Sequence, residues 1–167
     1  MALAKGRYEI GMAQDAGHVR EAQRLRWLCF VGARRGESDP ESLDADDYDQ
    51  RCRHVLIRET ASGRLVACFR MLTLSGGAEI GESYSARFYN LSRLAGYGGR
   101  MAEIGRFCIH PEWGDPDILR LAWAALALWL GHAQARRAAA ARGTPSLSPV
   151  PPAHASRMPG PSPRDGP

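Results

Sequence analysis

The sequence predicts an α/β fold in which helices pack on a mainly antiparallel sheet. Two apolar strands joined by the turn Ala61-Ser62-Gly63 predict a hairpin, so neighbouring strands run antiparallel. A third apolar strand, at 101–110, precedes a helix that is apolar on nearly every side, and such a helix covers a sheet or another surface. For a chain of 167 residues these elements predict one layered domain.

The first elements are a short strand at 7–12 and a helix that ends near Ala33. Asp15 is the predicted N-cap of this helix, because its side chain can accept a hydrogen bond from the free backbone N–H groups of the first turn. The polar residues 36–49 then predict a loop. One face of the helix is apolar and consists of Val19, Ala22, Leu25, Leu28 and Cys29.

The hairpin strands are predicted at 54–59 and 64–73, and the run Ser75-Gly76-Gly77 ends the second of them. Residues 86–94 follow, and their apolar spacing predicts a short helix. The apolar positions of this predicted helix are Phe88, Leu91 and Leu94.

The last predicted helix begins at Asp115-Pro116, which combines a favourable N-cap with proline at the first helical position. It runs from Asp117 to at least Leu130. We therefore expect a folded domain at residues 7–130 and a disordered tail at 131–167. The tail is rich in Pro, Ala and Arg, and its few large apolar side chains cannot offset the entropy of ordering the chain.

The net charge of +4 belongs to this tail. Residues 131–167 hold five arginines and one aspartate, which leaves 17 of the 22 basic and 17 of the 18 acidic residues to cancel in the rest of the chain. The tail has no aromatic residue and no basic helical face. We therefore expect no nucleic-acid partner, despite a sequence pI of about 9.1.

The composition also bears on location and on metals. The four cysteines lack metal-ligand spacing, so we expect reduced, mostly buried thiols in a cytoplasmic protein, and no metal site. The segment from Met1 to Met12 lacks the apolar centre of a signal peptide. The longest apolar run, Leu121–Leu130, is shorter than the roughly 20 residues that a membrane-spanning helix needs.

The candidate functional residues are charged groups on apolar strands and in an acid-rich segment: Glu103, Arg106, Arg70, Asp46 and Asp49. A charge on a buried strand is costly unless it is paired or functional. Glu103 is a candidate general base toward an amine, Arg106 is a candidate fork for a carboxylate, and the aspartates are candidates to bind a cationic amine. Residues three apart on a strand point to opposite faces, so we expect Glu103 and Arg106 to diverge.

Each candidate also has a structural interpretation. Glu103 could form a cross-strand ion pair with Arg70. Arg106 could be buried against Asp46 or Asp49, and the two aspartates could belong to a solvated acidic loop that caps a helix. The residues alone leave these alternatives open.

The loop 111–117 leads into a helix N-terminus, which is a ready anion site. Three acids in or beside it, Glu112, Asp115 and Asp117, would repel a pyrophosphate. A donor that carries a nucleotide is therefore disfavoured.

The order and spacing of several short segments resemble those of a known family. Over about residues 7–130 the chain resembles the L-ornithine Nα-acyltransferases of the GNAT acyltransferase superfamily. This resemblance implies a GNAT-like, mixed but mainly antiparallel sheet with flanking helices. The segments are Asp46-Asp47-Tyr48-Asp49 with Cys52 to Leu56, Gly63 to Leu72, Glu82-Ser83-Tyr84-Ser85 with Phe88, Glu103 to Cys108, and Ile118 to Trp123.

The resemblance implies transfer of a 3-hydroxyacyl group from acyl carrier protein to the α-amine of ornithine, in the synthesis of lyso-ornithine lipid. Glu103 would be the base or the amine-orienting acid, and Arg70, Arg106, Asp46 and Asp49 would shape the acceptor pocket. The donor would bring its own phosphopantetheine arm, so no separate cofactor is expected. A peripheral contact with the inner face of the membrane is a further expectation.

Two alternatives accompany this interpretation. Acyl-homoserine-lactone synthases share the aspartates, the arginine and the Glu…Arg pair, and there the acceptor would be S-adenosylmethionine. A GNAT domain also continues beyond the helix at 117–130 with further strands, whereas 131–167 have the composition that another frame of GC-rich DNA would give. The other alternative is therefore a truncated, non-catalytic fragment whose GNAT-like sheet is incomplete at the C-terminus.

Overall fold

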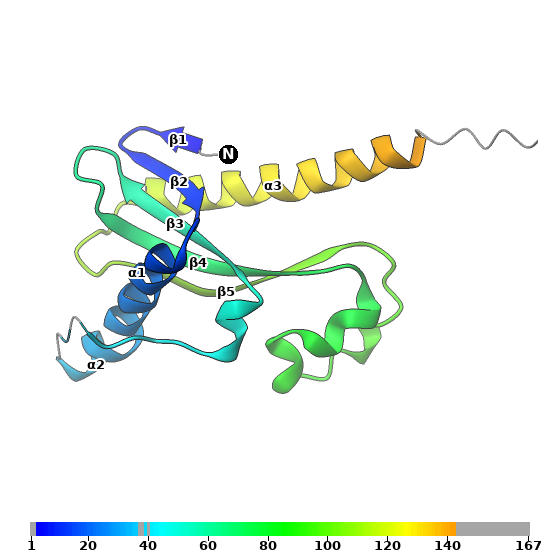
Figure 1. Cartoon of the computed structure of the whole chain (residues 1–167), viewed down its shortest axis with the longest axis horizontal. Helices are drawn as coiled ribbons and strands as arrows, with labels where there is room; N and C mark the ends of the chain where they lie inside the picture. Colours follow the sequence, from blue (N-terminus) through cyan, green and yellow to red (C-terminus); the bar gives the residue numbers. More distant parts are fainter. Residues whose placement is uncertain (1–2, 37–38, 40, 143–167) are drawn as a thin grey trace, which may run out of the picture. The chain divides into compact units, whose positions relative to one another are not determined.

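The computed structural model describes residues 3–36, 39 and 41–142 (Figure 1). The chain divides into two units, residues 1–131 and 132–167. In the first unit five strands form one sheet in sequence order, and every neighbouring pair is antiparallel. The strands are β1 (Leu3–Lys5), β2 (Tyr8–Met12), β3 (Arg53–Glu59), β4 (Leu65–Leu74) and β5 (Met101–Ile109).

The two long helices begin next to the capping residues that the sequence analysis named. Asp15 accepts a hydrogen bond from the His18 N–H at 2.9 Å, and Asp115 accepts one from the Asp117 N–H at 2.9 Å. The helical elements are α1 (Ala16–Trp27), the π-helical turn η1 (Leu28–Gly32), α2 (Ala33–Arg35), the 3-10 turns η2 (Asp47–Gln50), η3 (Gly77–Glu82), η4 (Ser85–Arg87) and η5 (Ser92–Leu94), and α3 (Pro116–Arg142).

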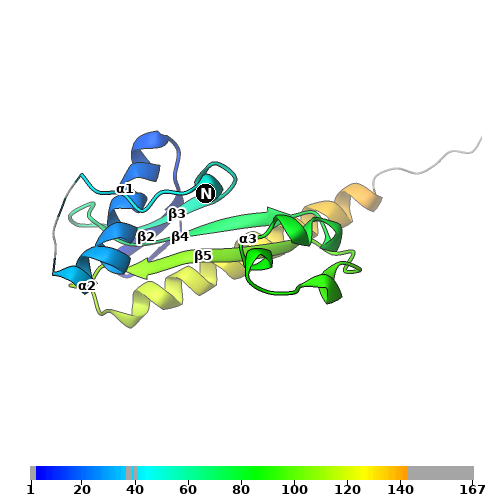
Figure 2. The ribbon, with the colours of Figure 1, turned by 90° about the horizontal axis from the view of Figure 1, so that it is seen from below.

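A helix covers each face of the sheet, which confirms the predicted layers (Figure 2). On one face, Val55, Ile57 and Phe69 pack with Ile118 and Leu126 of α3. On the other face, α1 contributes the smaller cluster. Because successive strand residues alternate between faces, β3 and β4 are apolar on both sides, as expected for central strands. The second cluster consists of Ala22, Leu25, Leu56, Cys68 and Cys108.

Three elements differ from the expectation. The short strand β1 was not predicted, and residues 86–94 form two separate 3-10 turns instead of a helix. Helix α3 continues to Arg142, so residues 131–142 are helical where we expected disorder. The Ala- and Arg-rich sequence there has a high helix propensity, which the disorder prediction ignored. Residues 143–167 of the predicted tail lie outside the described residues.

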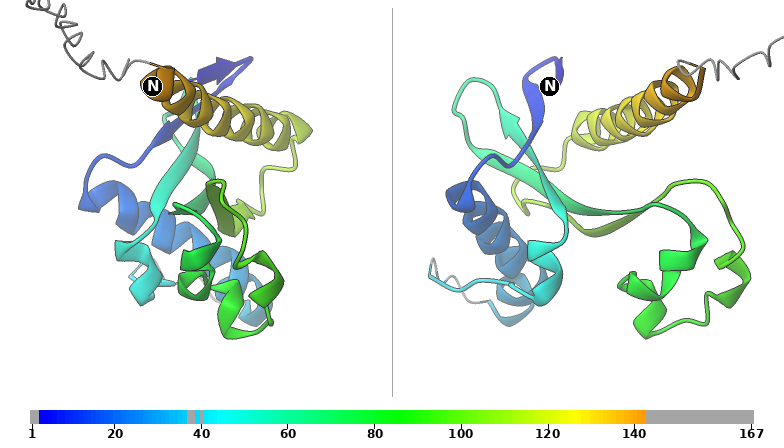
Figure 3. Two further views of the ribbon diagram at one scale, coloured as in Figure 1. Left: turned by 90° about the vertical axis from the view of Figure 1, so that its right-hand side faces the viewer. Right: turned by 45° about the vertical axis from the view of Figure 1, so that its right-hand side comes forward.

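The connection from β4 to β5 is the feature of the sheet that shapes the candidate site. Its three 3-10 turns lie beyond the far ends of the two strands, on the face of the sheet opposite α3 (Figure 3). Within the described residues, no helix combines the length and the apolar character that crossing a membrane requires.

A close backbone contact fixes this connection. The Gly77 N–H donates to the Tyr97 carbonyl at 2.7 Å, and a Cβ on Gly77 would lie 2.6 Å from the Ala95 carbonyl oxygen. We expect Gly77→Ala to lower the free energy of unfolding by about 1–3 kcal/mol, because the backbone would have to move. Thermal melts and limited proteolysis between β4 and β5 would measure the effect.

Gly81→Ala is the matched control, since a Cβ there meets nothing within 4 Å. Its melting temperature should stay close to that of the parent protein. Equal melting temperatures for the two variants would show that the contact at Gly77 is not stabilising.

Candidate functional site

Three aspartates and three arginines gather on the face of the sheet that α1 covers. The aspartates come from the segment before β3, and the arginines come from α1, β4 and β5, so four separate segments of the fold meet here. The two sets balance in formal charge. The six residues are Asp44, Asp46, Asp49, Arg26, Arg70 and Arg106.

Asp49 is the centre of this cluster. Arg26 donates to its two carboxylate oxygens at 2.8 and 2.7 Å, Arg70 donates at 2.8 Å, and Gln23 donates at 2.9 Å. The side chains of Asp49 and Arg26 are 6% and 1% exposed. Burial alone would raise the pKa of Asp49, but the hydrogen bonds from Arg26, Gln23 and Arg70 outweigh it and hold that pKa well below its ordinary value.

Asp46 joins the cluster to the sheet. Arg70 contacts its two oxygens at 2.5 and 2.9 Å, and Arg106 donates to it at 3.3 Å. Asp46 also caps η2 by accepting from the Tyr48 N–H at 2.9 Å. Burial would lower the pKa of Arg70, but its bonds to Asp46 and Asp49 raise it above the ordinary value.

The predicted aspartates are therefore paired with arginines. This geometry favours the structural interpretation, in which Asp46 and Asp49 hold Arg70 and Arg106 in place, over direct contact with a cationic amine. The capping role predicted for the acidic segment is found, but Asp49 itself is not solvated, because its side chain is only 6% exposed.

Sequence reasoning missed Arg26 and Asp44. Arg26 lies four residues after Ala22 on the apolar face of α1, and a charge in that position is a signal that a buried partner exists. Arg26 donates to the Asp44 carbonyl, and the Asp44 carboxylate forms ion pairs with Arg26 at 3.2 Å and Arg106 at 3.1 Å.

A β-bulge corrects the expected directions of Glu103 and Arg106. Cys68 pairs with Cys108 and Arg70 pairs with Gly105, so β5 has one residue more than β4 between these pairs. Arg106 lies at this bulge and has a positive φ of 53°. The bulge breaks the alternation, and both Glu103 and Arg106 line one pocket. The expectation that they diverge was therefore wrong.

This pocket has a volume of about 230 Å³. Tyr48 and Tyr84 form one side, with ring centroids 5.4 Å apart at near right angles. The guanidinium groups of Arg70 and Arg106 lie 5.8 and 5.7 Å from the Tyr84 ring, within the range of cation–π attraction. The remaining lining residues are Cys52, Leu72, Ser85, Glu103, Ile104 and Gly105.

Glu103 does not pair with Arg70. One of its carboxylate oxygens accepts the Tyr84 N–H at 2.8 Å, and the other accepts the Ser85 N–H at 2.8 Å and the Ser85 hydroxyl. Glu103 thus caps the turn η4 from the neighbouring strand. An ionised carboxylate has about four acceptor sites, so three bonds leave capacity for one more donor in the pocket.

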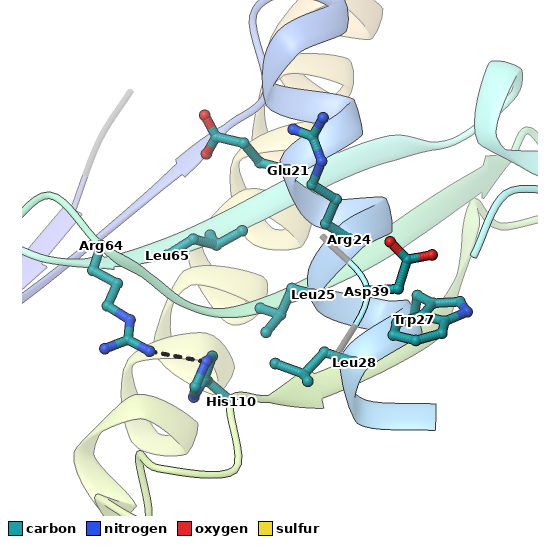
Figure 4. A pocket seen from close by; sticks show the side chains of 9 residues that line it. All are labelled: Glu21, Arg24, Leu25, Trp27, Leu28, Asp39, Arg64, Leu65 and His110. Carbon is teal, nitrogen blue, oxygen red and sulfur yellow. Dashed lines mark hydrogen bonds between the residues drawn. The ribbon is translucent and has the colours of Figure 1, made fainter. Parts of the chain in front are cut away.

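A second pocket, of about 320 Å³, is larger but lies elsewhere (Figure 4). It lies beside α1 and shares no lining residue with the pocket that contains Glu103. Its polar wall includes Arg64, which contacts His110 at 3.1 Å and Glu112 at 2.9 Å on an exposed surface. Because the acid–arginine cluster does not reach it, we place the candidate site in the smaller pocket.

Comparison with known proteins identifies relatives of the chain. A family model described as an acetyltransferase (GNAT) domain matches residues 25–124. An L-ornithine Nα-acyltransferase of Rhodobacter capsulatus is 36% identical over 136 residues, which cover 76% of this chain and 52% of the relative. No solved structure gives a significant match.

Two further relatives carry the same name. The protein of Rhizobium meliloti is 29% identical over 69% of this chain and 43% of its own length. The protein of Brucella abortus is 30% identical over 71% of this chain and 46% of its own length. The chain thus spans about half the length of the curated relatives that it matches.

Proposed function

Because the chain belongs to the GNAT acetyltransferase family, we propose that it is an N-acyltransferase that moves a 3-hydroxyacyl group to the α-amine of ornithine. The relatives named for this activity support the choice of acceptor. The observation that carries the proposal is that Glu103 and Arg106 line the same pocket. An acid and an arginine in one pocket suit an amino acid, which presents an ammonium group and a carboxylate.

Arg106 is the better placed of the two pocket arginines to bind the substrate carboxylate. The Arg70 side chain is 4% exposed, and both of its terminal nitrogens already donate to aspartates. The Arg106 side chain is 30% exposed and keeps part of its guanidinium available to the pocket. Arg70 and the aspartates then act as positioning residues that fix Arg106 and the pocket wall.

Glu103 is the residue we propose to handle the amine. In the reaction the amine nitrogen attacks the thioester carbonyl, a C–N bond forms, and the C–S bond breaks to release the donor thiol. The nitrogen must lose a proton before or during attack. The remaining acceptor site of the Glu103 carboxylate can orient the amine and receive that proton, while its three bonds to Tyr84 and Ser85 hold the carboxylate in place.

The proposed donor is acyl carrier protein rather than a nucleotide thioester. Asp115 at the start of α3 already accepts from the Asp117 N–H, Tyr8 and Arg7, so the helix N-terminus is satisfied by an acid of this chain. That arrangement repels a pyrophosphate, whereas a phosphopantetheine arm brings one phosphate. Because the acylated product is an amphiphile, we also propose a peripheral contact with the membrane.

The test is an acyl-transfer assay with the purified full chain, 3-hydroxyacyl carrier protein and ornithine, read by mass spectrometry of the amide. We expect Nα-acylornithine, and little product when an acyl coenzyme A replaces the carrier protein. Acyl-homoserine lactone formed from S-adenosylmethionine would favour the lactone-synthase alternative. A folded chain that transfers no acyl group to either acceptor would refute the proposal and favour the non-catalytic alternative.

A further inference from the structure

The connection between β4 and β5 exposes large aromatic side chains. Phe88, Tyr89 and Tyr97 are 65%, 69% and 53% exposed, and Leu94 is 44% exposed. All four lie between Ser85 and Arg100, a stretch that we call the aromatic–arginine loop. Single exposed apolar residues are ordinary, but several in one short stretch mark a surface that contacts a partner.

The same loop is basic. Arg87, Arg93 and Arg100 are exposed, and no acid occurs from Ser83 to Ala102. Within the part of the chain that the structure describes, none of these three arginines has an ion-pair partner. The adjoining acid, Glu103, faces the backbone of the Tyr84–Ser85 turn. The loop therefore combines aromatic rings with uncompensated positive charge.

Contacts within the connection between β4 and β5 hold these side chains in place. Tyr84 and Phe88 have ring centroids 5.2 Å apart, and the Gly77–Tyr97 hydrogen bond closes the base of the connection. Ser85, where the loop begins, and Tyr84 just before it also line the pocket that holds Glu103. A surface that received this loop would therefore lie next to the candidate site.

We propose that the aromatic–arginine loop docks the protein on a membrane surface that contains anionic lipids. Phenyl and phenol rings favour the interface between headgroups and acyl chains, and arginines beside them attract lipid phosphates. This inference assigns the peripheral membrane contact of the proposed function to a particular surface. It rests on the proposed function only for the reason why the protein would need the membrane. The acylated product would leave the pocket beside the bilayer.

The outer face of α3 is the competing surface. Trp123 and Leu119 are 61% and 43% exposed there. The arginine beside them, Arg120, pairs with Asp117 at 2.8 Å. Among the α3 residues whose side chains the structure describes, that face has no uncompensated positive charge to attract an anionic surface, and it supplies the matched control.

The test is co-sedimentation of the full chain with vesicles of phosphatidylglycerol and phosphatidylcholine in equal parts, against pure phosphatidylcholine. We expect binding to the anionic vesicles that weakens as salt is raised. Phe88→Ser with Tyr89→Ser should weaken it at least tenfold, and Arg93→Gln about fivefold. Trp123→Ser and Arg20→Gln, an exposed change on α1, should leave it unchanged.

The outcomes separate this inference from the acyltransferase proposal, because vesicle binding needs no turnover. Equal binding by the parent and the loop variants, with unchanged melting temperatures, would overturn it. So would loss of binding in Trp123→Ser, which would move the contact to α3. Weaker association of Arg93→Gln with acyl carrier protein, with vesicle binding intact, would assign the loop to the acidic carrier protein instead.

Discussion

Asp49→Asn is expected to lower the free energy of unfolding by about 3–5 kcal/mol, the cost of removing one partner from a buried ion pair. Asparagine has nearly the same shape as aspartate, so the loss of stability comes from removing the negative charge. Arg26 and Arg70, which are 1% and 4% exposed, would keep their positive charges without the carboxylate that they share. Denaturant titration of the two proteins would measure the difference.

Asp47→Asn is the matched control for this prediction. Asp47 lies two residues earlier in the same 3-10 turn and is exposed, so its replacement should change stability by less than about 0.5 kcal/mol. A similar small effect for both variants would show that the cluster around Asp49 does not stabilise the fold.

The same cluster predicts the acid sensitivity of the protein. The pKa of Asp49 is lower in the folded state than its ordinary value of 3.8, so folding favours the ionised form. The resulting stability is fully present above that ordinary value and is lost as the pH falls below it toward the lower folded pKa. Asp49→Asn should therefore lose less stability than the parent protein between about pH 4 and pH 2.

The elements of the fold could be predicted where local sequence decides the structure. Asp15 and Asp115 predicted the starts of two helices, because a capping side chain bonds to the first turn of the helix that it precedes. The apolar runs at 54–59 and 64–73 predicted the two strands of a hairpin, which the structure confirms as β3 and β4. The apolar spacing of Phe88 and Leu94 misled, because both side chains are exposed in the structure and periodicity alone does not show what covers a face.

The sequence named part of the candidate site but not its geometry, and it missed Arg26 and Asp44. Glu103, Arg106 and Arg70 do share one pocket. The bulge at Arg106 depends on how β5 pairs with β4, and strand alternation carries no information about an extra residue. Arg26 was not among the predicted site residues, because its burial depends on Asp49, 23 residues away.

Glu103→Gln is expected to lower kcat for acyl transfer to ornithine by roughly 10²-fold or more, the usual contribution of a general base. KM for ornithine should change less, because Arg106 still binds the carboxylate. Glutamine keeps the size of the side chain but cannot accept a proton at working pH. Single-turnover rates with acyl carrier protein as donor would measure the step directly.

The capping role of Glu103 requires its own control, because a glutamine amide would turn an N–H toward the N–H of Tyr84 or Ser85. Ser85→Ala removes one of the donors to Glu103 and leaves the carboxylate, so it measures the loss that comes from loosening the turn η4 alone. We expect both variants to lower the melting temperature, and only Glu103→Gln to lower kcat steeply. If kcat falls equally in the two variants, Glu103 holds the turn in place and another group takes the proton.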